Sequence, residues 1–442
     1  MFDTVEKNIS TRIAQHVQAR YGVETTAVLE QPKQASFGEL AIPVAFHLAR
    51  QLKQAPRAIA NQIVAELGGI AGVAALEVAG NGYINVRLDR GAYGIGVLRA
   101  VAEARPKVAG KIIVEHTNIN PNKAAHIGHL RNAILGDTFV RMLRSSGRNV
   151  EVQNYIDNTG AQVADVVAGF HYLETKSAAG VEQLLRDPAV RFDYYCWDLY
   201  ARVSAHFREH PEDLKWRLET LHEIEHRTGD RAQLAAIVAD AIVGCHLATM
   251  ERLGIRYDVL PRESEILHLQ FWETAFEQLK ERRAIYLETE GKNEGCWVMP
   301  ASAFKDQTRE DTEDSKVIVR SNNTVTYVGK DIAYQLWKFG LLGKDFYYRP
   351  WAQQDGHVVY ATTDQPQPAG GPAFGRGDSV YNVIDSRQSY LQDVVVAGLR
   401  ALGYEAQAEH SIHFSYEMVT LTPGTCVELG IELSEEDKKR SS

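Results

Sequence analysis

The segment of this chain with the clearest capacity for chemistry is the tetrapeptide His-Ile-Gly-His at residues 126–129. A β-branched run at 111–115 precedes it, as in a buried parallel strand, and apolar residues recur every three or four positions from Leu130, as on a helix face. The start of such a helix carries free N–H groups and a positive dipole end, and imidazoles there can donate to phosphoryl oxygens. The pattern predicts a site for nucleotide phosphates; the alternative is a helix start with two solvated histidines.

The elements around this tetrapeptide predict its place in a fold. Gly147 is a stop signal for the helix, and a second apolar run at 150–156 follows at once, so strand, helix and strand form one right-handed βαβ unit. Such units build doubly wound parallel sheets, whose ligands bind beyond the carboxyl ends of the strands. The predicted fold class is therefore α/β, with a doubly wound, Rossmann-like parallel sheet.

Length and composition limit the class of protein. The chain has 442 residues and a net charge of −9, which is long enough for two or three domains. Residues 1–110 carry 12 Lys and Arg against 9 Asp and Glu, whereas the other 332 carry 36 against 48, so a basic surface can coexist with an acidic body. We find no run of eighteen apolar residues, no signal segment, and no metal or disulfide spacing among the four cysteines. We expect a cytoplasmic protein with reduced thiols and no membrane partner.

The first predicted domain is a small α+β domain at residues 1–106. Helices are predicted at 2–21, at 41–52 and from Pro56, where proline suits a first helical turn. A hairpin is predicted at 76–88 around Gly-Asn-Gly.

The second predicted domain, residues 107–442, is the Rossmann-like one. It has a charge-dense helical insertion at about 170–260 and a mixed insertion at 262–320. Strand signals return at 324–328 and at 380–384.

A longer stretch around the tetrapeptide carries a family resemblance. Residues 115–133 read Glu-His-Thr-Asn-Ile-Asn-Pro-Asn-Lys-Ala-Ala-His-Ile-Gly-His-Leu-Arg-Asn-Ala, and 157–162 read Asp-Asn-Thr-Gly-Ala-Gln. This region resembles the class I arginyl-tRNA synthetases, and the first domain is similar to the family's additional domain, which contacts the outer corner of tRNA. The resemblance implies an arginine-tRNA ligase that activates L-arginine with ATP and transfers it to the 3′ end of tRNA(Arg). It also implies Mg²⁺ with ATP as substrate, no tightly bound cofactor, no metal site in the protein, and a monomer.

The resemblance further implies roles for individual residues in two adjoining parts of one site. Those that act on ATP are the catalytic His126, His129 and Lys123, with Gly128, Asn122, Met418 and Val419 in ATP binding. Those that bind arginine are Glu115, Asn120, Tyr327, Asp331 and Gln388.

The arginine pocket can also be argued from chemistry. A guanidinium requires an acid that binds it through two N–H groups, with neutral acceptors around it. Tyr327 and Asp331 lie four positions apart near a helix start, so they share one face. The alternative is Asp331 as a helix cap and Tyr327 as core. Gln388 takes its role from the resemblance of its segment, which the pair Gln353–Gln354 could mimic locally.

The resemblance also predicts parts that do not follow in this sequence. The family's Lys/Ser-rich second signature should come after Val419, followed by a helical anticodon-binding domain, and neither is found before Ser442. The prediction is a truncated form of the enzyme that binds arginine and turns over poorly or not at all. The alternative is a non-catalytic synthetase paralogue that binds arginine or tRNA.

One motif points to a different class of enzyme. His222-Glu-Ile-Glu-His226 matches the His-Glu-x-x-His pattern of zinc metallopeptidases. A working site needs a third ligand and a buried helix, whereas the flanking residues here are charged. A solvated surface helix is therefore expected, with the metallopeptidase as the other hypothesis.

Overall fold

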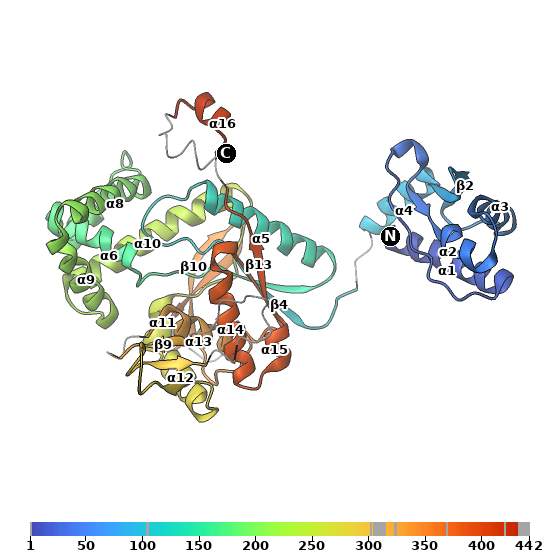
Figure 1. Cartoon of the computed structure of the whole chain (residues 1–442). Helices are drawn as coiled ribbons and strands as arrows, with labels where there is room; N and C mark the ends of the chain where they lie inside the picture. The colour runs from blue at the N-terminus through green and yellow to red at the C-terminus, as the bar shows by residue number, and fades with distance from the viewer. Residues whose placement is uncertain are drawn as a thin grey trace. The chain divides into compact units, whose positions relative to one another are not determined.

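The computed structural model of the chain describes residues 2–102, 106–300, 303, 315–321, 325–367, 370–419 and 421–431. The chain forms two compact units, Met1–Pro106 and Lys107–Ser442, and each has its own hydrophobic core (Figure 1). The two units are described separately.

The first unit is a three-stranded antiparallel sheet, in the order β1-β3-β2, packed against helices. Its elements are α1 (Phe2–Tyr21), η1 (Ala35–Phe37), β1 (Leu40–Ile42), α2 (Val44–Leu52), α3 (Pro56–Glu66), β2 (Val73–Ala79), β3 (Tyr83–Leu88) and α4 (Arg90–Ala102). The predicted hairpin is β2–β3, and its turn requires Gly82, because a Cβ there would lie 2.8 Å from Pro56. The predicted helix at 41–52 begins only at Val44. Pro43 favours an extended residue before it, and the preceding residues pair with β3.

The second unit is built on a seven-stranded sheet in the order β10-β11-β6-β5-β4-β12-β13. Its strands are β4 (Lys111–Glu115), β5 (Asn149–Gln153), β6 (Val259–Leu260), β10 (Tyr347–Gln354), β11 (His357–Thr363), β12 (Ser379–Asp385) and β13 (Ser411–Tyr416). Neighbouring strands pair in parallel except β10 and β11, which form an antiparallel hairpin at one edge. The predicted doubly wound α/β sheet is confirmed, with an antiparallel edge strand that the sequence did not reveal.

Helices cover both faces of this sheet (Figure 1). One face shares a core with α5 (Ile127–Ser145), which ends just before Gly147, as predicted; this glycine has a φ of 83°. The other face packs against α13 (Tyr327–Lys338) and α14 (Ser389–Ala401). Two short helices, α15 (Glu405–Glu409) and α16 (Pro423–Glu428), lie later in the chain.

The segment between β5 and β6 is helical and folds around a core of its own. Its elements are α6 (Ala161–Ala168), η2 (Gly169–Leu173), α7 (Ala178–Arg186), α8 (Phe192–Glu209), η3 (Pro211–Asp213), α9 (Leu214–His226) and α10 (Gly229–Arg252). By length and composition α10 could cross a membrane, but 50% of its apolar stretch is buried. Leu234, Val238 and Ile242 of α10 belong to the core of this segment, which is the pattern of a core helix.

A smaller mixed segment follows β6. Its elements are α11 (Glu263–His268), α12 (Phe271–Glu281) and an antiparallel sheet of β7 (Tyr286–Leu287), β8 (Trp297–Met299) and β9 (Lys316–Val319). The strand signal predicted at 324–328 is wrong for most of its length, because α13 begins at Tyr327 and only Val325 makes a bridge, to Val319. Residue 324 and the charged end from residue 432 lie outside the described residues.

Candidate active site

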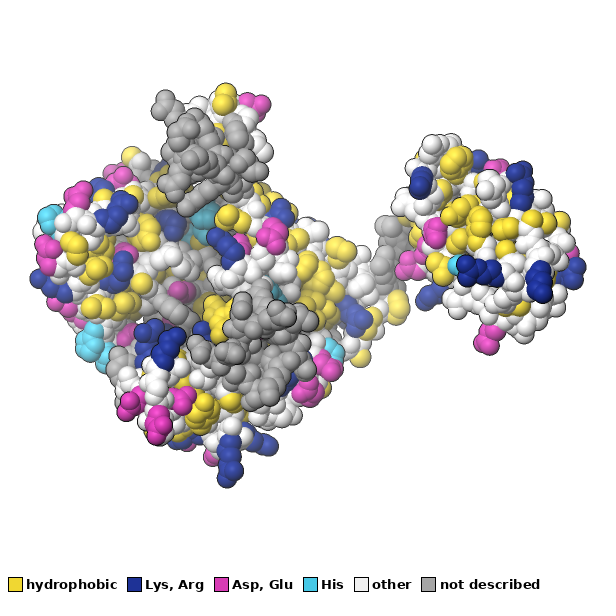
Figure 2. Space-filling view, in the orientation of Figure 1, with side chains coloured by type: hydrophobic (Ala, Val, Ile, Leu, Met, Phe, Trp, Pro, Cys, Tyr) yellow, Lys and Arg dark blue, Asp and Glu magenta, His cyan; other side chains and the backbone are white. Residues whose placement is uncertain are grey.

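A cavity of about 700 Å³, here called the first cavity, opens at the carboxyl ends of β4, β5, β12 and β13. Strand order reverses next to β4, which makes this the switch point where doubly wound sheets bind ligands. The predicted site residues that line it are Glu115, Asn120, His126, Gly128, His129, Asp331, Gln388, Met418 and Val419. Figure 2 shows a hollow in the surface of this unit, with basic and acidic side chains along it.

The start of α5 forms one wall of the first cavity. His126 is the N-cap with an extended backbone, and its N–H donates to Nδ1 of His129 at 3.2 Å. The two rings stack with their centroids 3.6 Å apart. Gly128 leaves room for this arrangement, since a Cβ there would lie 3.2 Å from the His126 ring. Because Nδ1 of His129 accepts a hydrogen bond, its proton lies on Nε2, where it can be donated to a ligand.

The two histidines differ from an ordinary exposed pair in their protonation. Burial, and then the nearby charges of His126, His246 and Lys123, lower the pKa of His129 to about 3. Burial and the charge of Lys123 also lower the pKa of His126. Both rings are therefore neutral at pH 7, and they offer N–H donors to phosphate oxygens without carrying a full charge.

Lys123 and Asn122, both predicted to act on ATP, lie outside the lining of the first cavity. The Lys123 ammonium is 3.4 Å from the side-chain oxygens of Asn122 and Gln162, and 5.1 Å from the centroid of the Tyr200 ring. Burial lowers the pKa of Lys123. Asn122 is fully buried. The lysine therefore faces the helical segment and would have to rotate to reach a phosphate in the cavity.

Glu115, at the end of β4, is held by residues that the sequence did not single out. Lys338 forms an ion pair with it, with 2.5 Å between Nζ and Oε2, and the Asn118 amide donates to Oε1 at 2.7 Å. Lys338 is only 2% exposed and also donates to the Asn382 side chain at 2.9 Å. A buried pair of this kind fixes Glu115 in place.

A second carboxylate, Glu263 at the start of α11, is saturated with donors. It accepts hydrogen bonds from Lys330 at 2.7 Å, from the Thr159 hydroxyl at 2.6 Å and from the Tyr155 hydroxyl at 2.9 Å. Burial raises its pKa, but the charge of Lys330 and these hydrogen bonds outweigh it, so the net pKa is lowered. Glu263 is therefore an ionised wall residue with little capacity left for a ligand.

Asp331 has no such partner among the described residues, and Asp157 accepts hydrogen bonds from the backbone N–H groups of Thr159 and Gly160. Both carboxyl groups line the same cavity. Burial, followed by the charges of Glu263 and Glu115, raises the pKa of Asp331 to about 7. Burial and the charge of Glu263 likewise raise the pKa of Asp157. A cation that enters the cavity would relieve this crowding of negative charge.

One face of α13 supplies most of this chemistry. Asp331, Tyr334, Gln335 and Lys338 follow the spacing of a single helix face, and all four line the cavity. That polar stripe on a mostly buried helix was the signal that could have revealed Lys338. Tyr327 begins the same helix, but its side chain lies outside the described part of the structure.

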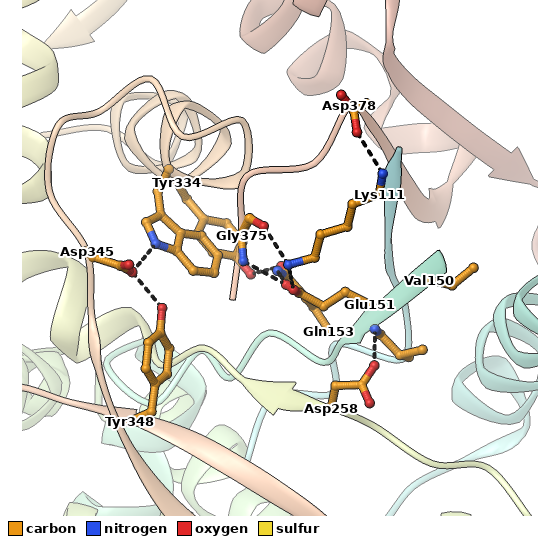
Figure 3. Close-up of polar contacts among 12 residues, drawn as sticks. Lys111, Val150, Glu151, Gln153, Asp258, Tyr334, Asp345, Tyr348, Gly375 and Asp378 are labelled. Carbon is orange, nitrogen blue, oxygen red and sulfur yellow. Dashed lines mark hydrogen bonds and ion pairs between the residues drawn. The ribbon is translucent and has the colours of Figure 1, made fainter. Parts of the chain in front are cut away.

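A buried hydrogen-bond chain supports this face of α13 (Figure 3). The Tyr334 hydroxyl donates to Oε1 of Gln153 at 2.7 Å, and Nε2 of Gln153 donates to Glu151 at 2.7 Å. Glu151 in turn forms an ion pair with Lys111. The centroid of the Tyr334 ring lies 4.3 Å from Nζ of Lys338, so this hydrogen-bond chain connects the lysine that lines the cavity to β5 and β4.

The loop after β4 is held in a strained shape beside the cavity. Thr117 has a φ of 79° and Asn118 a φ of 45°. A positive φ is unusual for a β-branched residue such as threonine, so the strain lies mainly at Thr117. The Asn132 side chain accepts from the Thr117 N–H at 2.6 Å and donates to the Val383 carbonyl at 2.8 Å. This asparagine, which the sequence did not reveal, ties α5 to β12 and to the strained loop.

The His-Glu-x-x-His motif lies on α9. Nδ1 of His226 bonds to the carbonyl of His222 at 2.8 Å, and Glu223 forms an ion pair with Arg231 at 2.5 Å. Within the described residues no group of three metal-ligating side chains is found. Nothing in this geometry favours the metallopeptidase.

Comparison with known proteins agrees with the geometry. Residues 5–88 match the family described as "Arginyl tRNA synthetase N terminal domain", and residues 98–344 match "tRNA synthetases class I (R), catalytic domain". Arginine–tRNA ligase of Thermococcus sibiricus is 34% identical over 91% of this chain and 64% of its own length, and that of Deinococcus radiodurans is 35% identical over 94% and 65%.

Solved structures give the same result. Arginyl-tRNA synthetase of Thermus thermophilus superposes with a TM-score of 0.72 at 32% identity, over 93% of this chain and 65% of that one. The Plasmodium falciparum enzyme, at 13% identity and a TM-score of 0.61, shares the fold. The chain therefore spans less than two thirds of the length of the relatives named here. By its family match and these relatives, the chain belongs to the class I arginyl-tRNA synthetases.

Proposed function

We propose that this chain performs the chemistry of an arginine–tRNA ligase, with L-arginine, ATP and tRNA(Arg) as its substrates. The observation that carries this proposal is Asp331, whose pKa of about 7 reflects a buried cavity with too much negative charge. A guanidinium is always charged and presents two N–H groups to one carboxylate, so it relieves that charge better than any neutral side chain does.

In the first step the arginine carboxylate attacks the α-phosphorus of ATP, and pyrophosphate leaves with the electrons of the broken P–O bond. His126 and His129 donate N–H groups to phosphate oxygens as charge develops on them, and the start of α5 adds its dipole. Asp331 holds the guanidinium, with Gln388 beside it in the turn η5 (Ser386–Gln388). Mg²⁺ enters bound to ATP and neutralises phosphate charge.

In the second step a hydroxyl of the tRNA terminal ribose attacks the arginyl carbonyl carbon, and AMP leaves. Glu115 and Asn120 hold the amino and carboxylate ends of arginine through both steps. Catalysis here consists of positioning and charge stabilisation, without a covalent enzyme intermediate. Lys123 joins the ATP phosphates by turning away from Gln162, and Asn122, Met418 and Val419 complete the ATP contacts.

The two units divide the work in this proposal. Residues 1–106 contact the outer corner of tRNA, in keeping with the excess of Lys and Arg there. Residues 107–442 carry both chemical steps, with the segments at about 170–260 and 262–320 as insertions. We infer a cytoplasmic monomer.

Calorimetric titration tests the proposal. Arginine should bind saturably, whereas lysine, citrulline and glutamine should bind at least tenfold more weakly, since each lacks the charged fork. Asp331→Asn should abolish that selectivity. The control is Glu182→Gln, which removes an exposed acid on α7 that is paired with Arg186. Equal binding of arginine and citrulline, with or without tRNA present, would contradict the proposal.

A further inference from the structure

A second cavity, of about 410 Å³, lies at the same carboxyl edge of the sheet. The end of β11, the turn after β6 and the start of α10 line it. Its charged residues are Arg227, Arg262, Arg349, Asp240 and Glu265. None of these residues has a part in the reaction described above.

The first and second cavities share a partition made of two turns. Asp157 lines the first cavity, and the next residue, Asn158, lines the second. In the same way, Glu263 lines the first cavity and Ser264 the second. The Asn158 amide donates to the Ser264 hydroxyl at 3.0 Å, and the Ser264 N–H donates back at 3.1 Å. The two cavities are therefore neighbours on either side of one hydrogen-bonded wall.

The arginines of the second cavity have unused hydrogen-bond donors. Arg262 is 8% exposed and forms an ion pair with Asp240, at 2.6 Å, through one terminal nitrogen, while its buried Nε–H has no partner among the described residues. Arg227 is paired with Glu265 and Asp364. Each guanidinium carries five N–H donors, so all of these arginines can bind more than they already do.

Arg349 is the basic group with the most capacity for a ligand. Its guanidinium lies 4.5 Å from the centroid of the Trp351 ring, which also contacts Arg262 from 4.4 Å. No carboxylate within the described residues lies at ion-pair distance from it. Burial and the charge of Arg262 lower the pKa of Arg349. An anion between the two arginines would remove this repulsion.

The backbone adds a further attraction for anions. Gly229, the first residue of α10, and Ala232 and Gln233 of its first turns line the second cavity. The positive end of the dipole of this 24-residue helix therefore points at the same space as the arginines.

We propose that the second cavity is a phosphate subsite for the 3′ strand of tRNA, with Arg262 and Arg349 as the ligands of one backbone phosphate. This assignment rests on the proposed function, because the terminal ribose must enter the first cavity. Free phosphate or pyrophosphate offers the same chemistry, so the experiment has to separate these sources. An ion-pair cluster that only joins the helical segment to the sheet is the structural alternative.

The experiment is a binding cycle on the full chain. A tRNA(Arg) transcript and the same transcript without its 3′ single strand are titrated against the unmodified chain, Arg349→Gln and the matched control Arg186→Gln. Arg186 is an exposed arginine on α7, paired with Glu182. Arg349→Gln should weaken binding of the whole transcript by about tenfold relative to the control, as expected for a lost charged hydrogen bond, and should leave the shortened one unchanged.

Three outcomes would overturn the assignment. Equal weakening of both transcripts means a contact elsewhere on tRNA, and no weakening means a structural ion-pair cluster. Binding of inorganic pyrophosphate or phosphate that Arg349→Gln abolishes, without a difference between transcripts, assigns the site to the free anion. Arginine titration of the same variants keeps the proposals apart: if selective arginine binding persists while the transcript difference is absent, only the phosphate subsite fails.

Discussion

The first and second cavities occupy one edge of one sheet and share the same partition, yet they carry opposite chemistry. In the first, Lys338 neutralises Glu115 and Lys330 neutralises Glu263, which leaves the acid Asp331 without an ion-pair partner among the described residues. In both cases the carboxyl ends of the parallel strands provide the place for a cavity. The residues that follow each strand decide whether that cavity carries excess negative or excess positive charge.

The second cavity mirrors this pattern with the signs reversed. Asp240 neutralises Arg262, Glu265 neutralises Arg227, and Arg349 is left without a carboxylate in the part of the chain that the structure describes. Each cavity thus uses internal ion pairs to fix its walls and keeps at least one charged group without an ion-pair partner for a ligand. A cation site and an anion site can lie side by side because hydrogen-bonded turns separate them.

The largest expected effect comes from breaking the ion pair in the first cavity. Lys338→Met should lower the free energy of unfolding by about 3–5 kcal/mol at neutral pH, because the buried Glu115 would lose its counter-charge. Urea unfolding followed by tryptophan fluorescence measures this. The double variant Lys338→Met/Glu115→Gln should recover most of the loss; a single variant as stable as the unmodified chain would contradict the role given to the pair.

The next effect concerns pH. With a pKa of about 7, Asp331 is protonated below neutrality, so arginine affinity should fall about tenfold for each pH unit below 7. The folded chain holds the Asp331 proton more tightly than the unfolded chain does, because the pKa is raised on folding. The stability that the protonated Asp331 contributes is therefore full below about pH 4 and is lost as pH rises through about 7. Calorimetry and unfolding across this range should lose both dependences in Asp331→Asn. Dependences that persist in the variant would belong to another group.

The partition itself should have a smaller effect. Asn158→Ala removes both hydrogen bonds to Ser264 and should cost about 1–2 kcal/mol of stability. A double-mutant cycle with Ser264→Ala measures the coupling, again by urea unfolding. Additive losses would show that the two turns are held together by something other than this contact.

The smallest effect is expected when a residue of the second cavity is changed and ligand binding in the first cavity is measured. Arg349→Gln should leave arginine affinity in the first cavity within about twofold, because the partition and the ion pairs screen one cavity from the other. Calorimetry with arginine at low and physiological salt measures this. A large change at both salt concentrations would mean that the two cavities act as one electrostatic site.

Local patterns in the sequence were enough for the elements nearest the chemistry. The strand at 111–115, the helix predicted from the apolar pattern that starts at Leu130, and its stop at Gly147 all appear. A β-branched run, an apolar period of 3.6 and a glycine after a helix are all local properties of the sequence. The hairpin at 76–88 appears for the same reason, through the turn chemistry of its glycines. The roles of the predicted site residues remain proposals.

Other features depended on contacts between distant segments. In the sequence, Lys338 looks like an ordinary basic residue in the last turn of a helix, where its charge interacts favourably with the negative end of the helix dipole. Its burial against Glu115 follows from packing of α13 on the sheet. The prediction of a strand at 324–328 failed for a similar reason, because β-branched residues near a helix start look like a strand without their neighbours.

The sequence by itself determined the βαβ unit, the histidine pair at its helix start and the family to which the chain belongs, since each rests on residues close together along the chain. Only the tertiary structure decided the neutral state of those histidines, the spare acid of the first cavity and the existence of the second. Arg262 and Arg349 meet because β11 lies between β6 and β10 in the sheet, and no local period encodes strand order. Burial and the charges that burial brings together then set the chemistry of both cavities.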